Sequence, residues 1–188
     1  MDRELLKSVV EGLIFTASEP LTVSALAGTI RTASAETIQS VLDELEQEYL
    51  ERSRGFLLSK VAGGYQFRSL PKIAPWILEM KKVRPAKPRR AALETLCIIA
   101  YNQPVTKGRI EQIRGVESSG TLKYLLERDL IEVVGRKDVA GRPLLYGTSR
   151  RFLEVFGLPD LASLPPLPEI EKIEENLEST EPAPSPDP

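Results

Sequence analysis

Few side chains in this 188-residue chain could carry out catalysis or hold a metal ion. The sequence has no histidine and one cysteine, Cys97. These counts exclude Ser–His and Cys–His catalysis, histidine ligation of a metal, an internal disulfide and any metal site built from several cysteines. Cys97 lies on the apolar stripe of a predicted helix, which favours a buried thiol over a nucleophile, and no glycine-rich phosphate loop follows a predicted strand. We therefore expect no enzymatic activity, no cofactor, no metal and no small-molecule substrate.

Charged side chains are numerous, and they are unevenly distributed. Residues 1–80 have a net charge of −3, residues 81–151 of +9 and residues 152–188 of −8, which together give the overall −2. Residues 81–90 combine six basic side chains with two prolines, so we expect a stiff basic linker. Residues 168–188 are acidic, rich in proline and poor in apolar side chains, so we expect a disordered tail. Residues 169–178 alone have a weak helical pattern.

The elements on either side of the linker repeat each other at an offset of 84 residues. Each half opens with an amphipathic helix that runs into a proline turn, 18–22 in the first half and 102–106 in the second. Thr22 and Thr106 are candidate caps of a second helix, and Ser34 and Ser118 of a third. Leu26 and Ile110 are candidate core residues at equivalent positions.

A strand–turn–strand pattern follows each third helix. Residues 55–61 and 65–68 flank the turn 62–64, whereas 131–135 and 144–147 flank a longer loop that contains Gly141. The residues after the second hairpin, Phe152, Leu153 and Phe156, fit a closing helix that covers the second core. The sequence therefore predicts a mainly α fold with small β-wings (α+β): two tandem winged-helix domains at 1–80 and 91–167.

A winged helix commonly reads DNA through its third helix, so the charge of that helix matters. Residues 34–51 contain six carboxylates and no Lys or Arg, which would repel a duplex. In the second half, the third helix is 118–128. Its charged side chains are the basic Lys123 and Arg128 and the acidic Glu127. The basic side chains of the linker and the second wing either touch phosphates weakly and without specificity or are solvated surface. A protein-binding module is therefore the favoured class, with a DNA-binding transcriptional regulator as the alternative.

Four segments of the second half carry a resemblance to a known family. They are 92–106 (ALETLCIIAYNQPVT), 113–120 (IRGVESSG), 134–148 (VGRKDVAGRPLLYGT) and 152–158 (FLEVFGL). The chain resembles the segregation and condensation protein B (ScpB) family over about residues 4–168, most specifically over 91–168. The resemblance implies a non-enzymatic subunit of the bacterial SMC–kleisin complex. Such a subunit forms a homodimer, binds the kleisin ScpA and through it SMC, and acts in chromosome condensation and segregation.

Two sets of residues are candidates for these contacts. The opening helix has more apolar residues than one small core needs, and these form either a self-complementary dimer face or simply core: Leu5, Leu6, Val9 and Val10. The second wing supplies the candidate kleisin site, in which cations meet acidic residues of the partner. In that site Tyr146 either anchors the partner or only packs the hairpin. That set is Arg136, Lys137, Arg142, Leu144 and Tyr146.

The apolar runs are also informative about location. No run approaches the roughly 20 residues that span a bilayer. Residues 1–7 lack the basic start and apolar core of a signal peptide. We therefore expect a cytoplasmic, nucleoid-associated protein without a membrane partner.

Overall fold

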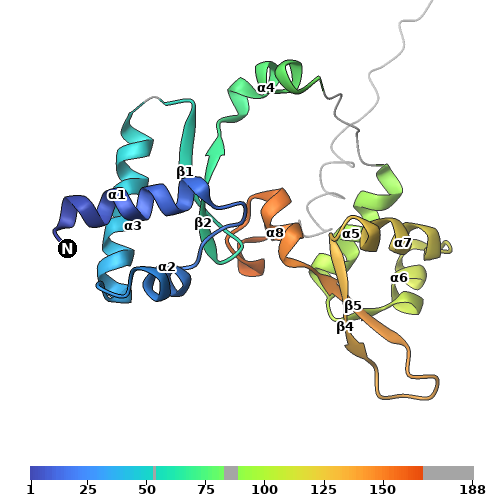
Figure 1. The fold of residues 1–188 in the computed structure, drawn as a ribbon. Helices are drawn as coiled ribbons and strands as arrows, with labels where there is room; N and C mark the ends of the chain where they lie inside the picture. The colour runs from blue at the N-terminus through green and yellow to red at the C-terminus, as the bar shows by residue number, and fades with distance from the viewer. Residues whose placement is uncertain (53, 83–88, 167–188) are drawn as a thin grey trace, which may run out of the picture.

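The computed structural model describes residues 1–52, 54–82 and 89–166 and divides them into two parts that each join helices to a hairpin (Figure 1). Most of the predicted linker and the whole predicted tail lie outside the described residues. Helices predominate, and both sheets are small and antiparallel. The predicted mainly α fold with small β-wings is confirmed.

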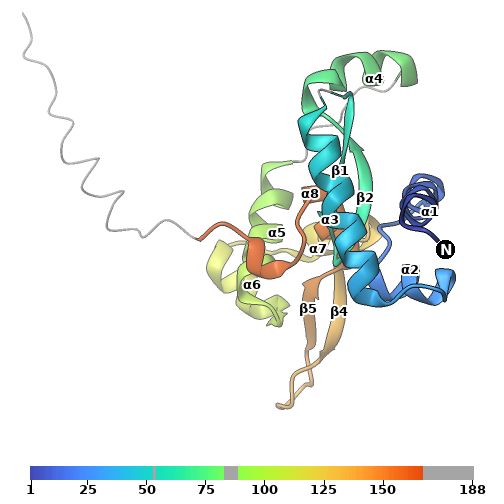
Figure 2. The same ribbon diagram turned by 90° about the vertical axis from the view of Figure 1, so that its left-hand side faces the viewer.

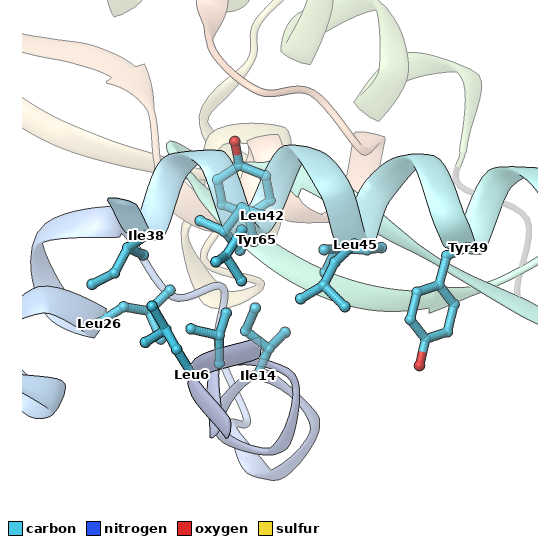
Figure 3. Packing of buried hydrophobic residues seen from close by; sticks show 11 residues of the cluster. Leu6, Ile14, Leu26, Ile38, Leu42, Leu45, Tyr49 and Tyr65 are labelled. Carbon is cyan, nitrogen blue, oxygen red and sulfur yellow. The ribbon is translucent and has the colours of Figure 1, made fainter. Parts of the chain in front are cut away.

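Three helices and a hairpin form the first domain: α1 (Arg3–Thr16), α2 (Val23–Ile30), α3 (Ala35–Glu51), β1 (Phe56–Val61) and β2 (Gly64–Ser69). The central helix is α3, which contacts α1, α2 and β1. Its buried residues recur at helical spacing, because one stripe of the helix faces the core. Figure 3 shows this stripe, with Ile38, Leu42 and Leu45 against Leu6 and Leu26.

The second domain follows the same plan with an added strand: α5 (Arg90–Asn102), β3 (Val105–Thr106), α6 (Lys107–Arg114), α7 (Ser119–Glu127), β4 (Ile131–Arg136), β5 (Leu144–Thr148), α8 (Arg150–Phe156) and η2 (Leu161–Ser163). Its sheet has the order β3-β5-β4, so β5 is the central strand. Ile110 is fully buried, as is Leu26 at the equivalent position of the first domain. These two residues have the equivalent core positions that the repeat predicts.

Three of the four predicted helix caps form. The hydroxyl oxygens of Thr22, Thr106 and Ser34 each accept a hydrogen bond from the backbone N–H three residues later. The prediction for Ser118 is wrong. Its side chain is buried and makes no capping bond, because it accepts from Arg114 Nη1 at 2.9 Å and donates to the carbonyl of Val116.

Besides β3 and η2, the structure contains η1 (Pro71–Ile73) and α4 (Ala74–Lys81), which the sequence analysis did not predict. Each has a proline in its first turn, where the missing N–H removes no hydrogen bond. Both ribbon views place α4 beyond the end of the first hairpin, away from α1 and α2 (Figures 1 and 2).

The hairpin of the first domain contacts the second domain, and both views place β2 beside α8 (Figures 1 and 2). Its turn residues Ala62 and Gly63 both have positive φ, and their N–H groups donate to the carbonyls of Leu158 (2.9 Å) and Pro159 (2.8 Å). Two arginine side chains, one from each domain, add hydrogen bonds across the junction. Arg68 donates to the carbonyl of Glu154, and Arg150 donates to the carbonyl of Pro20, each at 2.7 Å. We call these four bonds the interdomain latch.

Candidate protein-interaction surfaces

The candidate dimer residues on α1 separate into two pairs. Leu6 and Val10 are buried in the first core (Figure 3 shows Leu6). For these two residues the structure therefore favours core packing over a dimer contact. They fill the core because they lie on the side of α1 that faces α3. Leu5 is 52% exposed and Val9 is half-buried, so only these two could reach a partner without opening the core.

Ion pairs, in addition to apolar packing, hold α1 against α3. Lys7 donates to the carboxylates of Glu48 and Glu44, and Arg3 donates to Glu44 at 2.9 Å. The hydrogen bonds that Lys7 donates to Glu48, and then to Glu44, raise the pKa of Lys7 above its usual value. Those from Lys7 and then Arg3 lower the pKa of Glu44. Two of the six α3 carboxylates are therefore neutralised within the domain.

The other carboxylates of α3 keep its outer face acidic. Glu36, Asp43, Glu46 and Glu51 are exposed. Within the helix, Asp43 accepts a hydrogen bond from the side-chain amide of Gln39, and Glu51 accepts one from that of Gln47. Both donors are neutral. An unneutralised row of carboxylates opposes a nucleic acid backbone and favours a neutral or basic protein surface.

Large, exposed apolar side chains of the first domain lie on α4, an element that sequence reasoning missed, and at the end of α1, where Phe15 is 73% exposed. Trp76 is 71% exposed and Met80 is 73% exposed. No residue of α4 is buried, and Leu50 at the end of α3 is also exposed. The available signal was the sole tryptophan of the chain in a short apolar run after Pro75. The run is too short to display a helical period, so spacing alone does not predict this helix.

The candidate kleisin residues also separate according to burial. Arg136, Lys137 and Arg142 are exposed on the second wing, where Arg136 donates to the carbonyl of Arg142 at 3.2 Å. Of the two roles that the sequence left open for Tyr146, its burial favours packing of the hairpin over a partner anchor. Tyr146 lies on the central strand β5 and is buried in the second core. Leu144, on the same strand, is half-buried and packs against that core.

An apolar groove of about 310 Å³ lies on the second domain between α5, α8 and the segment after α8. Leu93 and Cys97 of α5, Phe156 of α8, and Leu158, Leu164 and Pro165 of the final segment all line it. The prediction of a buried Cys97 is wrong, since its side of α5 faces this groove and the thiol is exposed. The prediction for the closing helix is right for Phe152, which is buried, but Phe156 is 48% exposed in the groove wall.

The described residues offer no alternative site for metal or membrane chemistry. Within residues 1–52, 54–82 and 89–166, His, Cys, Asp and Glu form no group of three or more that could hold a metal ion. In the same ranges, no helix has the length and apolar character required to cross a bilayer. The candidate surfaces in these ranges are therefore the acidic face of α3, the basic second wing, and the apolar α4 and groove.

Comparisons with known proteins link this chain to one family. The family model of the segregation and condensation complex subunit ScpB matches residues 8–167. A segregation and condensation protein B from Syntrophotalea carbinolica is 48% identical over 179 residues, which are 95% of this chain and 90% of that protein. Among solved structures, ScpB from Mycobacterium tuberculosis is 32% identical, covering 84% of this chain and 98% of that one, with a TM-score of 0.41. A dimer of the ScpB N-terminal domain complexed with ScpA peptide is 26% identical over 41% of this chain and 95% of that one, with a TM-score of 0.38.

Proposed function

The chain belongs to the ScpB family of segregation and condensation complex subunits, and we propose that it is a non-enzymatic, homodimeric subunit of the bacterial SMC–kleisin complex. In this role it binds the kleisin ScpA and, through ScpA, acts with SMC in chromosome condensation and segregation. It works in the cytoplasm at the nucleoid. The family match over residues 8–167 is the observation that carries the proposal.

The charge of α3 supports a scaffold over a sequence-reading regulator. In a winged helix that reads bases, the third helix presents Arg, Lys, Asn or Gln to base edges and has basic neighbours for the phosphates. Here α3 has no Lys or Arg and an exposed row of carboxylates. The turn of the first wing is occupied by Leu158 and Pro159, so it is not free to enter a groove of DNA.

For the homodimer, α4 is a better face than α1. An eight-residue helix is too short to be stable alone in water, and α4 buries none of its residues within its own chain. Trp76 and Met80 supply the large apolar area that an interface core requires. Leu5 and Val9 remain from the sequence prediction as the competing face.

Sedimentation of the full chain distinguishes the two faces. We expect a dimer for the wild type and a monomer for the Trp76→Ser/Met80→Ser variant, with Leu5→Ser/Val9→Ser as the matched control that stays dimeric. Dissociation of the control alone would move the interface to α1. A wild type that stays monomeric at all concentrations would reject the homodimer.

For the kleisin, the exposed part of the predicted site is the basic tip of the second wing. Arg136, Lys137 and Arg142 project into solvent there, where they could steer an acidic segment of ScpA and hold it at the edge of the sheet. The burial of Tyr146 removes the proposed aromatic anchor, so these cations and the half-buried Leu144 are what remains of the site.

Titration calorimetry with purified ScpA tests this site. We expect the triple charge reversal Arg136→Glu/Lys137→Glu/Arg142→Glu to weaken binding about tenfold or more, mainly at low salt. Lys123→Glu on α7 is the matched control and retains wild-type affinity. Because the solved complex with ScpA peptide contains an N-terminal domain dimer, the α4 variant is titrated in parallel. A loss confined to the α4 variant would place ScpA on the first domain, and no binding by the wild type would reject the proposed function.

The regulator alternative rests on the same three cations, which also suit phosphate oxygens. It predicts tight, sequence-selective duplex binding by the chain alone, with a steep dependence on salt. We expect binding that is weak and indifferent to sequence.

A further inference from the structure

The side of α1 that faces away from α3 is an apolar surface that no described element covers. Phe15 is 73% exposed and Leu5 is 52% exposed, and Ser8 and Gly12, which lie between them, are exposed as well. These four residues are spaced by three, four and three positions, so they share one side of the helix. Figure 2 shows α1 at the edge of the molecule. We call Leu5, Ser8, Gly12 and Phe15 the outer face of α1.

The charged side chains of α1 are used mainly on its other side. Arg3 and Lys7 donate to carboxylates of α3, and Glu11 accepts a hydrogen bond from the hydroxyl of Tyr49. The fourth charged residue, Glu4, lies in the first turn of the helix. A helix face that is covered by water normally carries charged side chains. The uncharged outer face, with a large apolar side chain at each end, therefore resembles a surface that another polypeptide covers.

The outer face is complementary to itself. Leu5 and Phe15 are ten residues apart, which is about 15 Å along the axis and about 80° around it, so they lie on opposite sides of the middle of the face. Two copies of α1 that pack antiparallel, with a two-fold axis level with Val10, place Leu5 of one copy beside Phe15 of the other at both ends. In the same arrangement Ser8 of one copy lies opposite Gly12 of the other, where short side chains let the helices approach closely.

A second copy of this chain fits the outer face better than an unrelated helix would, because each large side chain meets its counterpart. The two Glu4 side chains lie at opposite ends of such a pair and do not face each other. Both ribbon views place α4 away from α1, so the contact can form whether or not α4 is covered (Figures 1 and 2). We infer that the outer face of α1 binds the outer face of a second copy as an antiparallel helix pair, a self-association surface additional to α4.

The length of α1 limits the strength of this contact. A helix of 14 residues is about 20 Å long, and one pair of such helices buries less than the roughly 1,200 Å² of a stable interface. The pair is therefore weak by itself. In a chain that is already dimeric through α4, a step that rests on the proposed function, the α1 pair joins one dimer to the next.

Disulfide cross-linking of the full-length protein tests the orientation of the pair. Two chains are mixed, one with Ser8→Cys and one with Gly12→Cys, and both carry Cys97→Ser, which removes the only native thiol. Ser8 is exposed and a Cβ on Gly12 meets nothing within 4 Å, so both substitutions fit the fold. In an antiparallel pair, positions 8 and 12 of different copies are level and within reach of a disulfide, whereas like positions are offset by about 6 Å along the axis.

After oxidation with copper phenanthroline, intact mass separates the mixed disulfide from the two like disulfides. We expect the mixed product to exceed the two like products together about fivefold, because only the mixed pair is level. Adding Leu5→Ser/Phe15→Ser to both chains should remove this excess. The matched control is Ile113→Ser/Val116→Ser, which removes two exposed apolar side chains from the second domain and should retain the excess.

Three results would overturn the inference. Random collision gives as much mixed disulfide as the two like disulfides together, and this ratio is also expected if a helix of another protein is the true occupant. An excess of like disulfides would indicate a parallel pair. An excess of mixed disulfide that survives Leu5→Ser/Phe15→Ser would mean that the outer face does not hold the pair. The cross-link lies on α1, so its formation does not depend on whether α4 forms the proposed dimer.

Discussion

In the first domain the hairpin β1–β2 makes a two-residue turn and delivers the N–H groups of Ala62 and Gly63 to the second domain. In the second domain the hairpin β4–β5 has the longer tip 137–143 and projects away from the other elements, with Arg136, Lys137 and Arg142 exposed (Figure 1). A short tip of small residues can be buried against a neighbour, whereas burying three cations without partners would be costly. The chemistry of the hairpin tip, rather than the shared fold, thus determines whether a wing makes an internal or an external contact.

The largest expected effects test whether the two cores follow the same plan. Leu26→Ala and Ile110→Ala remove equivalent, almost fully buried side chains, so each should cost about 2–5 kcal/mol of unfolding free energy. Urea unfolding followed by circular dichroism measures both. If only one of the two variants lost less than about 1 kcal/mol of unfolding free energy, the two domains would differ in core packing as well as in the contacts of their hairpin tips.

One closely packed glycine in each hairpin should show a smaller, asymmetric effect. A Cβ on Gly64 would lie 2.8 Å from backbone atoms of Leu21, whereas one on Gly147 would lie 2.9 Å from the side chains of Gln103 and Val134. Side chains can move more easily than backbone, so Gly64→Ala should cost about 3 kcal/mol and Gly147→Ala about 1 kcal/mol. Thermal unfolding checks the order, and the reverse order would mean that the second wing is packed more rigidly.

The interdomain latch is expected to contribute less to stability than to orientation. Arg68→Ala/Arg150→Ala removes two charged donors at a partly exposed interface, and we expect a loss of about 1 kcal/mol. We also expect a larger radius of gyration in small-angle X-ray scattering, because the domains separate. Arg151→Ala is the control, since Arg151 pairs with Glu154 inside α8. An unchanged radius in the double variant would show that the two backbone bonds of the turn are sufficient.

The smallest effect is the response to acid. The bonds from Lys7 and Arg3 hold the pKa of Glu44 below its usual 4.5. The folded value lies below the unfolded one, so this stabilisation is complete above pH 4.5 and is lost as the pH falls through the lowered value. In the second domain, bonds from Ser119 and then Lys107 have the same effect on Glu117. Glu44→Gln and Glu117→Gln should each flatten the acid limb of thermal stability measured against pH, and added salt should weaken both effects.

The sequence was sufficient to predict the repeat, the hairpins and most caps, because these depend on local spacing. Its errors involve packing direction. Leu6 and Cys97 each lie on an apolar stripe, but the first faces α3 and the second faces an open groove. Tyr146 has an amphipathic side chain, yet its place on the central strand decides its burial. Which side of an element is covered depends on neighbours distant in sequence, and spacing alone does not identify them.

All four acceptors of the interdomain latch are backbone carbonyls, those of Leu158, Pro159, Glu154 and Pro20. A carbonyl remains an acceptor whichever side chain its residue carries. The four acceptor residues can therefore change in sequence while the angle between the halves is preserved, provided that the donors Arg68 and Arg150 are kept. The spacing between the proposed dimer and kleisin faces then depends on the main chain and two arginines.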